Sequence, residues 1–69
     1  MINTELLLEK LNKSGFTMTF VAKELGITYQ AFLDKVNNKR EFTYGEIISL
    51  GQLLHLKGKE VNKIFFMWD

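Results

Sequence analysis

The chain has 69 residues, of which 46% are hydrophobic and 25% are charged, and this length and balance fit one domain spanning residues 1–69. It has no cysteine, which excludes a disulfide framework, a zinc knuckle and a thiol nucleophile. No apolar run approaches the roughly 20 residues of a membrane span, and the first residues lack the pattern of a signal peptide. We therefore expect a cytoplasmic protein without a membrane partner.

The net charge of +1 selects no partner, but the charges are unevenly distributed along the chain. Residues 10–40 carry six Lys or Arg against two acidic residues, whereas residues 1–9 and 41–56 each have a net negative charge. An anion-binding face requires positive charge gathered in this way. Charges spread evenly over a solvated surface would give the same counts, so an anion-binding face and an ordinary charged surface both remain possible interpretations.

Glycines and capping residues divide the chain into five predicted helices. The first is capped by Asn3 or Thr4, and the turn after the third is made by Asn37 and Asn38. Gly58 interrupts the pattern before the last helix. With their caps, the predicted helices cover about residues 3–13, 17–25, 28–37, 43–54 and 59–66.

The start of the fourth predicted helix has the clearest local signal. Thr43 and Glu46 have the spacing of a capping box, in which each side chain bonds the backbone N–H of the other residue. Phe42 and Ile47 flank the box as a hydrophobic staple. Gly51 lies inside this helix and is expected to let another helix approach closely.

Residues 17–38 predict a helix-turn-helix motif. Gly26 can adopt the positive φ that the tight turn requires, and Ala22, one helical turn earlier, leaves room where the two helices cross. Apolar residues fill the angle from the core side: Val21, Leu25, Ile27 and Phe32. The sequence therefore predicts an all-α fold, a compact five-helix bundle with a central helix-turn-helix.

This motif, its exit at residues 37–39 and the segments 42–47 and 64–66 resemble the Cro/CI-type (XRE) family, particularly short phage-encoded regulators. The resemblance covers nearly the whole chain and implies a lambda-repressor-like domain. It also implies a sequence-specific transcriptional regulator of a phage or mobile-element switch in a bacterial cell. Its third helix, about residues 28–37, would read the major groove of a double-stranded DNA operator. Lys35 stands where many members have a core aliphatic residue, a role that Val36 takes here.

Polar side chains on the third predicted helix are the candidates for base contacts. Gln30, Asp34 and Asn37 are expected to point outward together, and Thr28 and Tyr29 stand at the N-terminal tip. Gln30 can bond N6 and N7 of adenine, and Asp34 or Asn37 can meet cytosine N4 or adenine. Alternatively, Gln30 and Asn37 are solvated surface residues, and Asp34 is either a specificity device or evidence against DNA.

Backbone contacts are expected at two further places. Asn38, Lys39 and Arg40 follow the third helix directly, where positive charge attracts phosphate regardless of sequence. Thr17 and Thr19 begin the second helix, whose free N–H groups favour an anion.

Three other side chains have less specific expectations. Lys23 and Lys35 are expected to add positive field rather than contacts. The hydroxyl of Tyr29 bonds a phosphate, or its ring packs beside Leu33.

Nothing in the sequence predicts an enzyme, a cofactor or a metal site. His55 is the only histidine, and one imidazole makes neither a metal site nor a catalytic dyad, so we expect a partly buried helix residue. Ser14 and Ser49 have no neighbouring base, and no phosphate-binding loop is present.

The C-terminus predicts a homodimer through the last helix and tail. Phe65, Phe66, Met67 and Trp68 are consecutive large apolar residues, and one small core cannot cover all of their directions. At least one of the last three is expected to stay exposed and to join two copies, which a palindromic operator requires. Alternatively, the tail folds back over the core.

A protein-binding module on the same scaffold is the alternative function. Such a module, for example an antirepressor, would dock on the DNA-binding domain of a repressor protein. The low net charge, the acid Asp34 on the reading face and the apolar surface of Leu33 and Tyr29 favour it.

Overall fold

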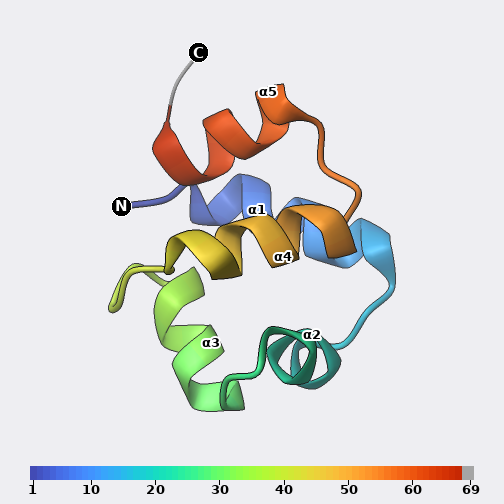
Figure 1. The fold of residues 1–69 in the computed structure, drawn as a ribbon, viewed down its shortest axis with the longest axis vertical. Helices are drawn as coiled ribbons and strands as arrows, with labels where there is room; N and C mark the ends of the chain where they lie inside the picture. The colour runs from blue at the N-terminus through green and yellow to red at the C-terminus, as the bar shows by residue number, and fades with distance from the viewer. Residues whose placement is uncertain (68–69) are drawn as a thin grey trace.

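The computed structural model describes residues 1–67, which form five α-helices and a final π-helical turn without any strand (Figure 1). The elements are α1 (Thr4–Ser14), α2 (Met18–Leu25), α3 (Tyr29–Val36), α4 (Tyr44–Leu53), α5 (Gly58–Val61) and its continuation η1 (Asn62–Phe66). The all-α five-helix prediction is confirmed. Gly58, expected to interrupt the pattern, is the first residue of α5.

The helices are arranged around α4 (Figure 1). On one side of α4, α1 packs against η1, and the backbone N–H of Asn3 donates to the carbonyl of Ile64 at 2.7 Å. On the other side, α2 contacts both α3 and α4. The helix-turn-helix pair therefore lies at the opposite end of the molecule from α5 and η1. Within residues 1–67, no helix has the length and hydropathy needed to span a bilayer.

Buried residues from α1, α2, α3, α4 and η1 form one hydrophobic core. Its buried members are Leu7, Leu11, Val21, Ala22, Phe32, Val36, Ile47, Leu50, Ile64 and Phe65. The half-buried Phe42 connects two of them, since its ring meets Phe32 and Phe65 edge-on at centroid distances of 6.2 and 5.5 Å. This aromatic cluster joins the exit of α3 to the C-terminal turn.

Helices α2, α3 and α4 end with the same type of turn, in which the first or second residue after the helix is left-handed. Gly26, Asn38 and His55 have φ values of 74°, 64° and 54°. In each case the next residue donates its N–H to a carbonyl five positions earlier, in the pairs Ile27–Ala22, Lys39–Asp34 and Leu56–Gly51. The turns at Gly26 and at Asn38 were predicted from the sequence.

The expectation of a partly buried, helical His55 is wrong. α4 ends at Leu53, and His55 is the exposed left-handed residue of the turn that follows. Because Leu54 and Leu56 on either side turn toward the core, the imidazole between them points outward.

The capping box predicted at the start of α4 is confirmed. Thr43 Oγ1 accepts the N–H of Glu46, and Glu46 Oε1 accepts the N–H of Thr43 at 2.8 Å, which completes the capping box. Gly51 faces α5, where a Cβ would stand 3.5 Å from a methyl carbon of Val61. This distance is ordinary van der Waals contact, so an alanine would also fit at this position, and the packing of α5 does not support the expected need for glycine here.

Candidate nucleic-acid interface

Threonine caps fix the starts of both helices of the helix-turn-helix. Thr17 Oγ1 accepts the N–H of Phe20 at 3.0 Å, and Thr28 Oγ1 accepts the N–H of Ala31 at 3.1 Å. Both threonines and Thr19 are exposed. Because each capping hydroxyl accepts with its oxygen, its proton remains able to donate to an outside acceptor such as a phosphate.

The outer face of α3 is polar and contains its own hydrogen bond. Gln30 is exposed, and its Nε2 donates to Oδ1 of the half-buried Asp34 at 3.0 Å. Asn37 is also exposed, but its Nδ2 donates back to the carbonyl of Leu33 at 3.0 Å. The Tyr29 ring is exposed at the N-terminal tip, so the structure does not bury it beside Leu33.

The exit of α3 presents two cations. Lys39 and Arg40 are exposed, and their backbone N–H groups both donate to the carbonyl of Asp34, at 2.8 and 3.3 Å. Among residues 1–67, no carboxylate forms an ion pair with either side chain. A tight turn therefore holds two exposed positive charges at the C-terminal end of the helix.

Asn38, the third expected contact at this exit, binds the N-terminal segment. Its Oδ1 accepts the N–H of Ile2 at 2.7 Å, and its Nδ2 donates to the carbonyl of Ile2 and to Thr4 Oγ1. The Thr4 hydroxyl in turn donates to the carbonyl of Val36. The Asn38 amide thus ties the start of the chain to the end of α3.

Lys35 corrects the expectation that it adds positive field. Its side chain is buried, at 6% exposure, and its Nζ donates to both oxygens of Glu46 at 2.6 and 2.8 Å. The neighbouring Val36 is buried as expected, so α3 turns both residues inward. Because a carboxylate neutralises it, Lys35 adds little field outside the protein, whereas Lys23 is exposed on α2.

The environment of Glu46 stabilises its charged form. Burial by itself would raise its pKa, but hydrogen bonds from Lys35 and from the Thr43 N–H, with the charge of Lys35, hold the pKa below its usual value. One carboxylate therefore both caps α4 and anchors the lysine of α3.

Sequence reasoning missed an exposed aromatic pair beside the motif. Phe16 and Phe20 are each 40% exposed, and their ring centroids are 4.9 Å apart. The available signal was a large aromatic residue on each side of the Thr17 cap, with Phe16 directly before it and Phe20 in the first turn of α2.

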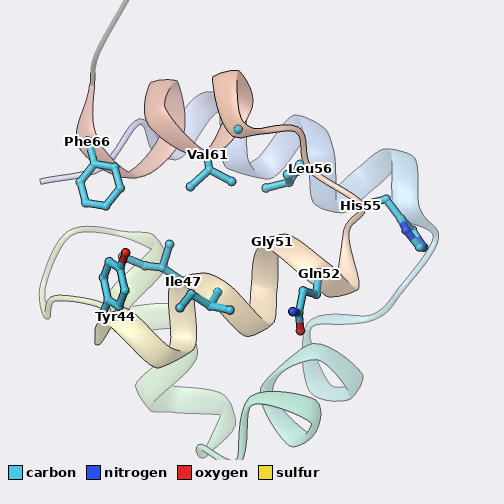
Figure 2. Close-up of a pocket in the computed structure, with 10 residues that line it drawn as sticks. Tyr44, Ile47, Gly51, Gln52, His55, Leu56, Val61 and Phe66 are labelled. Carbon is cyan, nitrogen blue, oxygen red and sulfur yellow. The ribbon is translucent and has the colours of Figure 1, made fainter.

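A second apolar surface is the α4–η1 groove, a hollow of about 590 Å³ between α4 and the α5–η1 segment (Figure 2). Figure 2 shows the rings of Tyr44 and Phe66 at one end and Gln52 and His55 toward the other. Its remaining lining is Ile47, Ile48, Gly51, Leu56, Gly58 and Val61.

The described part of the C-terminus agrees with the expected exposure. Phe65 is buried, whereas Phe66 and Met67 are exposed, so one core does not cover all the apolar directions. Trp68 lies outside the described residues.

Comparison with known proteins adds no further information on this site, since no family model, curated protein or solved structure matches the chain. Within residues 1–67, no three side chains of the metal-binding types come together.

Proposed function

We propose that the chain is a sequence-specific DNA-binding regulator of the Cro/CI type, which controls a phage or mobile-element switch. The observation that carries the proposal is the exposed polar face of α3, continued by Lys39 and Arg40, two cations that pair with no carboxylate within residues 1–67. An α-helix fits the major groove of B-DNA, where amide side chains can distinguish bases. Exposed cations at its end supply the attraction to phosphate that fixes the helix in register.

The helix-turn-helix distributes these roles over its two helices. In this proposal α3 enters the groove with Thr28, Tyr29 and Gln30 leading. The first turn of α2 meets the neighbouring backbone, where the free hydroxyl protons of Thr17 and Thr19 reach phosphate oxygens.

The proposal is tested by selecting duplexes from a random pool and comparing dissociation constants for a selected and a scrambled sequence. Gln30→Ala should weaken binding to the selected duplex by about 1–3 kcal/mol and leave the scrambled duplex unchanged, because it removes a base contact. Asn12→Ala, an exposed amide on α1, is the matched control and should change neither. Equal losses on both duplexes would rule out base reading by Gln30.

We further propose that two copies bind one operator as a homodimer joined through the α4–η1 groove and the tail after it. One recognition helix reads few base pairs, so a two-fold pair gains specificity from two half-sites. The apolar side chains exposed along and beside this groove support the choice of surface: Tyr44 is 72%, Ile48 47% and Met67 54% exposed. A patch of this kind is typical of an interface.

Sedimentation equilibrium across micromolar concentrations, with and without the selected duplex, tests the dimer. Ile48→Glu should shift the protein toward monomer, because a charge in an apolar interface loses its hydration. Ser49→Glu adds the same charge at the next, exposed position and should leave association unchanged. A wild-type protein that stays monomeric throughout, with one copy per duplex, would contradict the dimer.

The rival function, a protein-binding module such as an antirepressor, is favoured by one observation. The exposed Phe16–Phe20 pair offers a repressor domain an aromatic surface that DNA contacts do not require. The duplex selection separates the two functions, because an antirepressor enriches no sequence from the pool.

A further inference from the structure

The acid on the recognition helix is engaged with the residue expected to read a base. Gln30 Nε2 donates to Asp34 Oδ1 at 3.0 Å, across one turn of α3. A carboxylate only accepts hydrogen bonds. Asp34 therefore holds the nitrogen end of the Gln30 amide toward itself, which leaves Oε1 and the second Nε2 proton for an outside partner.

We propose that Asp34 is a positioning residue that makes Gln30 selective for adenine over guanine; this inference rests on the proposed DNA-binding function. Adenine offers an N6–H donor and an N7 acceptor, which match Oε1 and the remaining Nε2 proton of Gln30. Guanine offers two acceptors, O6 and N7, and would need both Nε2 protons. Because Asp34 takes one of these protons, the pair satisfies adenine and leaves a guanine oxygen facing Oε1.

The same acid lowers affinity for every duplex. Asp34 forms no ion pair within residues 1–67, so its negative charge repels the phosphates on both sides of the groove. Removing only the charge should therefore have two opposite consequences. Affinity for DNA of any sequence rises, and discrimination between adenine and guanine falls. A side chain with a merely structural role would not produce this combination.

The position read by Gln30 is identified first, as the adenine for which Gln30→Ala loses the wild-type base preference. The test then compares the selected duplex with a version that has guanine in place of this adenine. Wild-type protein should bind the guanine duplex about ten-fold or more weakly, as a single mismatch typically does. Asp34→Asn keeps the shape of the side chain but both donates and accepts, so it frees the Gln30 amide to turn. We expect it to reduce the ratio to about three-fold or less and to bind scrambled DNA more tightly.

Two further variants separate positioning from charge and from folding. Glu24→Gln removes one exposed charge from α2 without touching Gln30, and should tighten binding to both duplexes while keeping the wild-type ratio. Asp34→Ala removes the acceptor altogether and should lower the ratio as Asp34→Asn does. Thermal midpoints are recorded for each, and a loss of discrimination is attributed to positioning only in a folded variant.

These binding measurements can contradict the role of Asp34 separately from the proposed DNA-binding function. A wild-type protein that prefers no sequence overturns the proposed function and the inference together. A selective wild-type protein whose adenine preference survives in folded Asp34→Asn or Asp34→Ala overturns the inference alone. The inference alone is also overturned if the wild-type protein is selective and Gln30→Ala keeps the wild-type base preference at every position. Gln30 then contacts no base, and Asp34 has no base contact to direct.

Discussion

Adjacent asparagines at the end of α3 have different structural roles. Asn37 donates its amide to its own helix, at the carbonyl of Leu33, whereas Asn38 adopts a φ of 64° and binds Ile2 and Thr4 across the molecule. Asparagine tolerates the left-handed region better than most residues, and its short amide reaches backbone groups. Asn38 therefore both turns the chain and closes it onto its beginning.

A comparison of two glycines isolates the role of φ in the motif. Gly26 has a φ of +74°, whereas Gly45 lies within α4, and a Cβ would meet nothing within 4 Å at either site. Gly26→Ala should therefore destabilise the fold by about 1–2 kcal/mol through left-handed strain alone. Gly45→Ala should be neutral or stabilise by up to about 1 kcal/mol.

Chemical denaturation of both variants measures this difference. Equal changes in the free energy of unfolding at the two positions would contradict the assignment of Gly26 to a turn that requires positive φ.

At the scale of elements, a salt bridge and an aromatic cluster hold α3 against α4. Lys35 brings its charge from α3 to Glu46, which also caps α4, and the ring of Phe32 on α3 meets that of Phe42, just before the cap of α4, at a centroid distance of 6.2 Å. Removing one member of a buried ion pair is costly because the other charge is left unpaired, whereas replacing both members by well-packed apolar side chains is often neutral. Loss of either charge in the Lys35–Glu46 pair would therefore leave the other buried without its partner.

The pH dependence of stability tests this connection. The pKa of Glu46 in the folded protein lies below its unfolded value, which is about 4.3. Its contribution is therefore complete above pH about 5 and is lost as the pH falls through the folded pKa. Glu46→Gln should cost about 1–3 kcal/mol at pH 7, because Lys35 loses its charged partner, and should flatten the loss of stability between pH 5 and 3.

The control is Glu60→Gln, which breaks the more exposed pair between Lys10 and Glu60. The pKa of Glu60 is also lowered, chiefly by its hydrogen bond from Lys10. Solvent screens this pair more strongly, so its removal should flatten the pH curve less than Glu46→Gln. Unfolding curves for Glu46→Gln and wild type that stay parallel across this pH range would refute the salt-bridge role.

At the scale of the whole molecule, the sequence predicts what depends on near neighbours. The caps at Thr17, Thr28 and Thr43 bond residues three positions away, and the apolar spacing predicts which side of each helix enters the core. The Lys35–Glu46 pair joins residues 11 positions apart, and the Asn38–Ile2 contact spans 36. Both depend on how helices cross, which helical periodicity does not specify.

In the candidate site, too, the features set by near neighbours could be predicted and those set by long-range contacts could not. The exposure of Gln30, Lys39 and Arg40 follows from the predicted helix and its end. The hydrogen bond between Gln30 and Asp34 lies within one turn of α3, so the sequence could have predicted it. Helical spacing predicted only that the two side chains point outward together. Lys35 could not be placed correctly without α4.

The salt dependence of DNA binding tests the central claim, that the exposed face of α3 and its exit bind duplex DNA, most directly. Fluorescence anisotropy with the selected duplex would measure the slope of log affinity against log salt for wild type, Lys39→Ala, Arg40→Ala and Lys59→Ala. The last removes an exposed lysine from α5, which lies across α4 from the α2–α3 pair (Figure 1). We expect each of the first two variants to weaken binding and reduce the slope by about one unit, with Lys59→Ala unchanged. Slopes equal to that of wild type in both exit variants, or no binding by the wild type, would contradict the claim.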